Sequence, residues 1–292
     1  MNWKELPLLR RLSTKLLRNV DSQVKRDFAK KFGRLRVATT GPEIYVVSAD
    51  DQFVGKEILR RGHFEFDKFE NCISILGPKF NRKLLIDVGA NIGTTCIPAI
   101  SRGYFERAIA FEPEPLNHSI LLANIALNRL SERIEVKALA IGAERDQQLS
   151  FELSPINSGD HRVRVTENDG MENEAARKTI AVQSTTLDVA CGEVDPKSTL
   201  LWVDTQGYEG AVFKGAKKAM ACQTPIAFEF WPYGLNRTNG YADLKKCVEN
   251  ADYNNMADLR KPDTRIAPSS VNLDLIFNEL SQQNIHTDLI IW

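Results

Sequence analysis

The chain has 292 residues, a length that predicts one large α/β domain or two smaller domains. Hydrophobic residues make up 43% and charged residues 26%, which is the composition of an ordinary soluble globular protein. Lys plus Arg and Asp plus Glu each number 38, so the formal net charge is zero. Because a protein that neutralises many phosphates usually carries a basic excess, this balance argues against a nucleic-acid partner.

The sequence predicts neither a membrane span nor a disulfide framework. No apolar run approaches the roughly 18 residues that a membrane helix needs, and the N-terminus lacks a signal-peptide core. The five cysteines are odd in number and form no C-x-x-C pair, so we interpret them as small buried hydrophobic residues in a reducing compartment. We therefore expect a cytoplasmic protein.

Residues 1–36 differ from the rest of the chain, with eleven Lys or Arg against three Asp or Glu. Their apolar residues recur at three- and four-residue spacing, which predicts an amphipathic helix. We expect this helix to pack on its own domain; peripheral contact with an anionic membrane, or self-association, are the alternatives. Residues 37–82 read as a lead-in of a strand pair followed by helix.

From residue 83 to 292, short apolar runs alternate with amphipathic segments. This alternation predicts one α/β domain with a mostly parallel sheet and helices on both faces. A polar excursion at 156–178 interrupts the rhythm. The expected strands are 84–89, 108–114, 134–142, 149–155, 180–190, 199–207, 224–232 and the end of the chain, and the expected helices are 92–104, 116–130, 208–221, 241–250 and a segment after 273.

The run Asp87-Val88-Gly89-Ala90-Asn91-Ile92-Gly93 leaves one buried strand and enters a helix. Parallel sheets bind ligands beyond the carboxyl ends of their strands, and a glycine turn allows close approach of a nucleotide-like ligand. The spacing is not that of the dinucleotide motif G-x-G-x-x-G, and Asp87 would repel a pyrophosphate. The loop suits S-adenosylmethionine, which carries a sulfonium, an ammonium and a ribose but no phosphate.

Three further residues extend this cofactor hypothesis. Glu112 ends the next strand, 25 residues after Asp87, where an acidic side chain accepts hydrogen bonds from ribose hydroxyls in nucleotide-binding α/β folds. Thr94 and Thr95 open the helix after the glycine loop. Their hydroxyls either cap that helix or bind the methionine carboxylate, and the sequence leaves both roles open.

Six segments resemble, in order, the FkbM family of S-adenosylmethionine-dependent methyltransferases. They are LLIDVGANIGTTCIPAI, AFEPEPLNHSILLANIALN, FELSPINSGDHRVRV, TTLDVACGE, LLWVDTQGYEGAVFKGA and HTDLIIW. The resemblance implies a seven-stranded class I methyltransferase fold and methyl transfer to oxygen, with hydroxyls of sugars, glycans, glycolipids or related natural products as acceptors. It also implies that Asp87, Gly89, Asn91, Gly93 and Glu112 bind the cofactor.

A hydroxyl acceptor needs a general base or a metal, because it is barely ionised at neutral pH. The polar excursion supplies our first candidates, since loops on a rigid sheet carry such residues. We expect His161 to be the base, while Asp160, Arg162 and Arg164 bind the acceptor, the two arginines clamping an acidic group. The alternative is structural, with an Asp160–arginine pair holding the loop and His161 satisfied by backbone.

The next two strand ends carry further candidates. Asp204 could be the base, a metal ligand, a contact to the cofactor ammonium or a helix cap, and Gln206, on the turn that follows, is expected to bind the acceptor. Glu229 and Trp231 end the following strand and are expected to line the acceptor pocket. Asp204 with Glu229 could bind magnesium through oxygen ligands, which we favour less than metal-free catalysis.

Two other functions stay open at this point. The acceptor could be a protein or RNA group, although the balanced charge argues against RNA. The chain could also be a non-catalytic module that binds a nucleoside-like ligand at the sheet edge.

Overall fold

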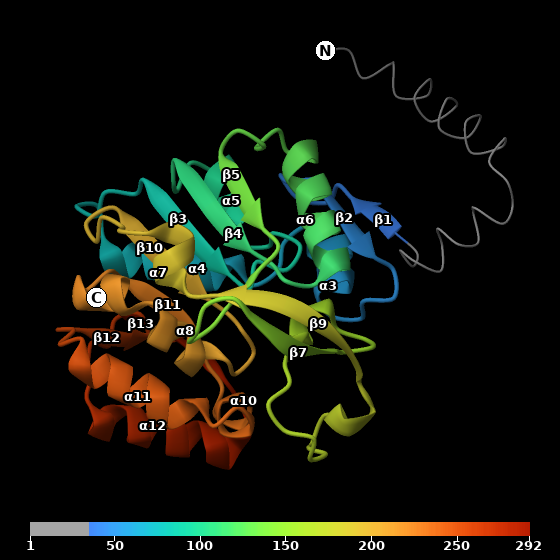
Figure 1. The fold of residues 1–292 in the computed structure, drawn as a ribbon. Helices are drawn as coiled ribbons and strands as arrows, with labels where there is room; N and C mark the ends of the chain where they lie inside the picture. Colours follow the sequence, from blue (N-terminus) through green and yellow to red (C-terminus); the bar gives the residue numbers. More distant parts are fainter. Residues whose placement is uncertain (1–34) are drawn as a thin grey trace, which may run out of the picture.

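The computed structural model describes residues 35–292, in which seven strands form one twisted sheet (Figure 1). Six strands run in the same direction, and β13 is antiparallel to both of its neighbours. The sheet order is β12 (Met256–Asp258), β13 (Thr287–Ile291), β11 (Ile226–Phe230), β10 (Thr199–Val203), β3 (Leu84–Val88), β4 (Arg107–Phe111) and β5 (Ile134–Lys137). The predicted seven-stranded, mostly parallel sheet is confirmed.

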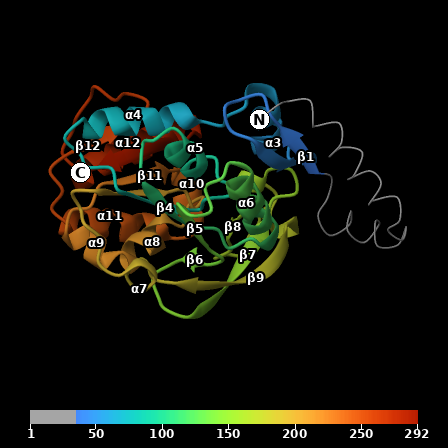
Figure 2. The ribbon, with the colours of Figure 1, turned by 90° about the horizontal axis from the view of Figure 1, so that it is seen from above.

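Helices cover both faces of this sheet, and each face has its own apolar core. Alternate residues of β10 show why: Leu200 and Trp202 pack into one core, whereas Leu201 and Val203 pack into the other. Figure 2 shows α4 and α5 on one side of the strands and α8 and α9 on the other. The first core includes α3 (Val54–Arg61), α4 (Phe66–Leu76), α5 (Cys96–Ser101) and α6 (Pro115–Leu127); the second includes α7 (Leu187–Cys191), α8 (Glu209–Gly215), α9 (Lys217–Ala221), α10 (Pro232–Arg237), α11 (Gly240–Asn250) and α12 (Ser270–Gln283).

A second, four-stranded sheet lies beside the main one and was not predicted as a separate unit. Its order is β6 (Ala140–Ile141), β9 (Lys178–Thr185), β7 (Gln147–Leu153) and β8 (Arg162–Val163). The expected strand 134–142 is divided between β5 and β6, so that it joins both sheets. The expected strand 180–190 is wrong beyond Thr185, because the Thr186 side chain accepts the N–H of Val189 and begins α7. The excursion contains β8 and two short 3-10 turns, Ser158–Asp160 and Glu174–Ala176.

The lead-in forms the hairpin β1 (Leu35–Ala38) and β2 (Tyr45–Ser48), followed by α3 and α4. The hairpin is tied to α6, because the Asn124 amide accepts the N–H of Val46 at 2.6 Å and donates to its carbonyl at 3.2 Å. The helix predicted at 1–36 lies almost wholly outside the described residues. Within residues 35–292 no helix combines the length and apolar character needed to cross a membrane.

Candidate active site

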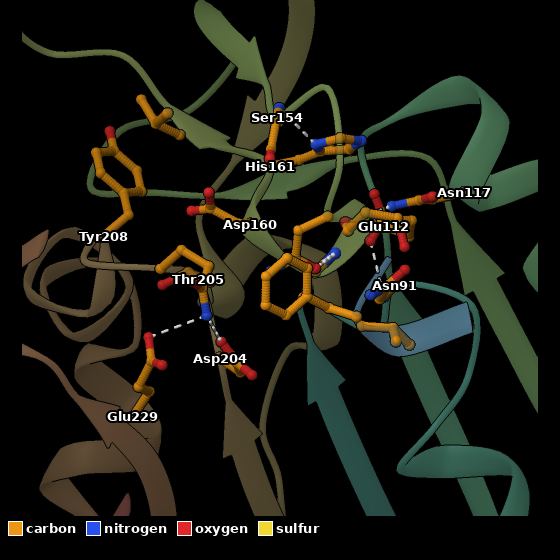
Figure 3. Close-up of a pocket in the computed structure, with 18 of the residues that line it drawn as sticks. Asn91, Glu112, Asn117, Ser154, Asp160, His161, Asp204, Thr205, Tyr208 and Glu229 are labelled. Carbon is orange, nitrogen blue, oxygen red and sulfur yellow. Dashed lines mark hydrogen bonds between the residues drawn. The ribbon is translucent and has the colours of Figure 1, made fainter. Parts of the chain in front are cut away.

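A cavity of about 1160 Å³ opens at the carboxyl ends of the parallel strands. Its walls come from the ends of β3, β4, β10 and β11, the start of β13, the second sheet with its excursion, and the lead-in. Figure 3 shows side chains from these elements converging on one space. The predicted site residues that line it are Asp87, Gly89, Asn91, Thr94, Thr95, Glu112, Asp160, His161, Asp204, Gln206, Glu229 and Trp231.

Asp87 and Gly89 shape the loop after β3. The Asp87 carboxylate is buried and accepts the N–H of Cys96, which satisfies the first turn of α5. Burial raises the pKa of Asp87 to about 7. Gly89 has φ +89°, and a Cβ there would lie 1.8 Å from the Asp204 carbonyl oxygen. Only glycine therefore allows β3 and β10 to end side by side as they do.

The other loop residues divide between packing and the cavity. Gly93 does not line the cavity, which corrects its expected contact with a cofactor: a Cβ there would lie 2.5 Å from Ile97 Cδ1, so this glycine serves helix packing. Thr94 and Thr95 do line the cavity. Thr95 precedes α5 but its side chain makes no capping hydrogen bond, so the capping role is wrong for this residue.

Glu112 is buried at the end of β4 and faces the glycine loop (Figure 3). Its two carboxylate oxygens accept the N–H of Asn91 at 2.8 Å and the N–H of Glu114 at 2.9 Å. Burial, and to a lesser extent the nearby Glu114 carboxylate, raise the pKa of Glu112 to about 8. The buried side-chain oxygen of Asn91 has no hydrogen-bond partner among the described residues. A ligand hydroxyl or amine would satisfy both groups.

His161 lines the cavity, but its hydrogen bond does not suit a general base. The Nδ1 atom accepts the backbone N–H of Ser154 at 3.0 Å (Figure 3). Burial lowers the pKa of His161 to about 4, so the ring is neutral near pH 7. A neutral imidazole whose Nδ1 accepts must carry its proton on Nε2, and that nitrogen donates hydrogen bonds. The geometry thus matches the structural alternative for this side chain better than the expected base.

The side-chain amide of Gln206 bridges Asp204 and Glu229. The Gln206 Nε2 donates to Asp204 Oδ1 at 2.7 Å and to Glu229 Oε2 at 3.1 Å. Burial raises the pKa of both acids, and for Glu229 the Asp204 charge raises it further. The expected cap role of Asp204 is not observed, because Glu209 accepts the N–H groups of Thr205 and Gly207 in this turn. Among residues 35–292, no three His, Cys, Asp or Glu side chains gather as a metal-binding group.

Arg162 and Arg164 do not line the cavity, so the structure does not bring the predicted clamp to the other site residues. Arg162 is buried and forms ion pairs with Glu152 and Glu174 at 2.9 Å and with Asp160 at 3.0 Å. Arg164 pairs with the other Glu152 oxygen at 3.1 Å. Buried arginines that already have carboxylate partners are not available to an acidic ligand.

This ion-pair network supports the cavity wall from behind. The Arg162 guanidinium lies 5.0 Å from the centre of the Trp231 ring, which itself lines the cavity. Arg177, absent from the sequence-based candidates, holds Asp160 at 2.6 Å. Asp160 is therefore a structural partner of two arginines as well as a lining residue, as the structural alternative expected.

The cavity is also lined by residues that are not among the sequence-based candidates, and four polar side chains among them reach it only through tertiary contacts. Lys68 of α4 and Asp288 of β13 line its acidic end and lie 2.8 Å apart. Asn117 of α6 and Tyr208 before α8 line other parts of it, and Figure 3 shows both side chains directed toward the space. Asn117, Tyr208 and Asp288 lie in segments that resemble the family, but their positions in those segments do not show that they reach the cavity, and Lys68 lies in no such segment.

Comparison with known proteins gives one match to a family model and several distant structural matches. The model described as "Methyltransferase FkbM domain" matches residues 87–253. A search of curated proteins finds no match. Among solved structures, a methyltransferase FkbM from Methylobacillus flagellatus is 18% identical, with a TM-score of 0.43; the match covers 72% of this chain and 44% of that one. The chain thus spans less than half the length of that protein.

Two further solved structures are 11% identical to the chain. The geranyl diphosphate C-methyltransferase of Streptomyces coelicolor has a TM-score of 0.43, and the match covers 81% of each chain. The protein TYW2 of M. jannaschii, crystallised with AdoMet, has a TM-score of 0.38, and the match covers 88% of this chain and 84% of that one.

Proposed function

The chain belongs to the FkbM family of S-adenosylmethionine-dependent methyltransferases, and we propose that it methylates a hydroxyl of a sugar, glycan, glycolipid or related natural product. One observation carries this proposal: a single cavity joins Glu112 and Asn91 at one end to Asp204 and Glu229 at the other. The first end offers hydrogen-bond acceptors for a nucleoside. The second end offers a carboxylate that can take the proton from the hydroxyl group of the methyl acceptor.

The residues of the first end fit S-adenosylmethionine. The Asn91 side-chain oxygen is buried without a partner, and each Glu112 oxygen accepts one backbone N–H with lone-pair capacity left for a ribose hydroxyl. Thr94 and Thr95 face the cavity beside these groups and would bind the methionine carboxylate. When bound, this cofactor supplies a methyl group on an already activated sulfonium.

Asp204 is the group that we assign as general base. It lies at the end of β10 and lines the cavity, while the Gln206 amide orients one of its oxygens. Burial raises its pKa toward the range in which a base works well at neutral pH. Asp204 accepts the hydroxyl proton as the new oxygen–carbon bond forms and the sulfonium–carbon bond breaks. The positive charge of the donor and the negative charge of Asp204 are both lost in this step, so charge balances.

His161 takes a different role in this proposal. Its Nε2–H would donate to an oxygen of the acceptor and orient it, because Nδ1 is occupied by Ser154. Magnesium held by Asp204 and Glu229 is the alternative route, in which the metal would stabilise the acceptor oxygen. Loss of transfer on addition of EDTA, restored by magnesium, would favour that route.

The test uses the full chain, S-adenosylmethionine with a deuterated methyl group, and extracts separated into saccharide, lipid, protein and RNA fractions. Mass spectrometry should show the labelled methyl group on a hydroxyl in the saccharide or lipid fraction. Asp204→Asn should slow transfer by about 10²–10⁴-fold, as expected for loss of a general base. The control Glu135→Gln removes a carboxylate that is 62% exposed, and it should leave transfer unchanged.

Three results would contradict the proposal. Label confined to protein or RNA would move the acceptor to another class, and no label in any fraction would favour a binding module. Full activity of Asp204→Asn would remove Asp204 as the base. S-adenosylhomocysteine affinity should be measured in each variant, so that loss of donor binding is not read as loss of catalysis.

A further inference from the structure

A lysine from outside the family-matched segment reaches the acidic end of the cavity. Lys68 lies on α4, before residues 87–253, and its side chain is 21% exposed. Its Nζ lies 2.8 Å from Asp288 Oδ2 and 2.7 Å from Glu65 Oε2. Asp288 also lies outside that segment, on β13. Two flanking segments therefore add a charge pair to the site of the methyltransferase domain.

The position of Asp288 creates an electrostatic conflict that Lys68 relieves. In the antiparallel pairing of β11 and β13, Asp288 is directly opposite Glu229, and both side chains are buried. Like charges directly opposite each other destabilise a sheet. Within residues 35–292, Lys68 is the only cation within 4 Å of Asp288, and none comes that close to Glu229. The Lys68 charge thus acts on both Asp288 and Glu229, and of these two carboxyl groups the ammonium contacts only Asp288.

Asp204 is a third carboxyl group in the same region, and like Glu229 it lacks an ion-pair partner among the described residues. Asp204 shares the Gln206 amide with Glu229, as described above. Burial raises the pKa of Asp204, Glu229 and Asp288, and the Lys68 charge opposes this rise for each of them. The other charged or titratable groups that act on this cluster are Glu65, Cys72, Asp87, Glu209, Arg260 and His286.

We propose that Lys68 and Asp288 are positioning residues that give Glu229 and Asp204 different protonation states. Lys68 keeps Asp288 ionised, and the charges of Asp204, Glu209 and Asp288 together keep the proton on Glu229. The Asp288 charge also acts on Asp204, but the Gln206 amide, 2.7 Å from Asp204 Oδ1, favours the ionised form of that carboxyl group. Asp204, which is not paired across the strands with Asp288, is left as the ionised carboxylate that can accept a proton. Two carboxyl groups whose surroundings push their proton affinities apart divide the acid and base tasks of a site between them.

The catalytic consequence rests on the proposed function, but the charge assignment does not. It can be measured without an acceptor, from the carbonyl stretch of protonated carboxyl groups in the infrared spectrum of the full chain in heavy water near pD 7. The wild-type spectrum should contain a protonated-carboxyl band that Glu229→Gln removes. Asp288→Asn should reduce the same band, because Glu229 then ionises more readily.

Lys68→Met should change the spectrum in the opposite direction. Without the ammonium, no cation of residues 35–292 remains within 4 Å of either buried carboxyl group, so Asp288 takes up a proton while Glu229 keeps its own. The protonated-carboxyl band should then grow by the intensity of about one group. Lys68→Arg should restore the wild-type spectrum. The matched control is Lys214→Met, which removes a lysine 3.0 Å from Asp243 in an exposed ion pair and should leave the band unchanged.

The outcomes separate this inference from the proposed function. An unchanged band in Glu229→Gln, or equal spectra for wild type and Lys68→Met, would overturn the assignment even if methyl transfer is observed. The expected spectra without any methyl transfer would support the charge assignment and count against the enzyme. Thermal unfolding should accompany each spectrum; if Lys68→Met does not fold, Asp288→Asn and Glu229→Gln decide the matter.

Discussion

Donor binding should depend strongly on pH through Glu112. Burial raises the pKa of this carboxyl group to about 8 in the donor-free protein. At pH 7 such a group is ionised in roughly one molecule in ten. A ligand that binds only the ionised form therefore has an affinity ~10-fold lower than it would have for a fully ionised carboxylate. A ribose that donates hydroxyl hydrogen bonds favours the ionised form. The affinity should therefore rise by about 100-fold between pH 6 and pH 9.

Titration calorimetry with S-adenosylhomocysteine measures this directly. Wild type should release about one proton on binding at pH 7, seen as a difference between buffers of different ionisation heat. Glu112→Gln should bind more weakly and lose most of the pH dependence; Asp87, with a pKa of about 7, accounts for what remains. Glu135→Gln, an exposed control, should behave as wild type. Equal pH dependence in wild type and Glu112→Gln would refute the ribose assignment.

Three further predictions concern the cavity wall. Gly89→Ala should unfold at a much lower urea concentration than Gly103→Ala. Both glycines have positive φ, but the new Cβ meets the Asp204 carbonyl at Gly89 and open space at Gly103. Equal losses of stability in the two variants would contradict the packing argument. The His161 ring should stay neutral from pH 5 to 8 with its proton on Nε2, which long-range ¹H–¹⁵N NMR detects; titration near pH 6.5 would exclude the buried arrangement. Glu174→Gln removes the negative charge of the buried pair with Arg162 and should lower the free energy of unfolding in urea by about 3 kcal/mol. A decrease below about 1 kcal/mol would show that the pair is dispensable.

The sequence was sufficient for the features that depend on local patterns. The apolar run ending at Val88 predicts a strand buried on both faces, and all of β3 except Leu84 is buried. The ends of parallel strands meet at one edge of a sheet, so the chain order alone placed Asp87, Glu112, Asp204 and Glu229 together. These predictions required only the order and direction of the strands.

The acceptor side was harder to predict because its contacts depend on strand pairing across the chain. Arg162 and Arg164 were interpreted as a ligand clamp, because they alternate along an extended segment and should share a face. In the structure β7 pairs antiparallel with β8, and Glu152 lies directly opposite Arg162. The same limit applies to Asp288, which meets Glu229 only because β13 runs antiparallel to β11.

The geometry between donor loop and base depends on the sheet rather than on flexible loops. The Asp204 N–H donates to the Val88 carbonyl at 2.9 Å, and the absence of a Cβ on Gly89 lets the Asp204 carbonyl lie against the loop. Methyl transfer is an in-line displacement, so its rate depends on holding the donor carbon and the acceptor oxygen in line. The adjacent parallel strands β3 and β10 fix the distance between the donor loop and Asp204. The excursion forms a separate wall of the cavity that is held by its own ion pairs. Changes in the excursion can therefore alter which acceptor enters without moving Asp204 relative to the donor.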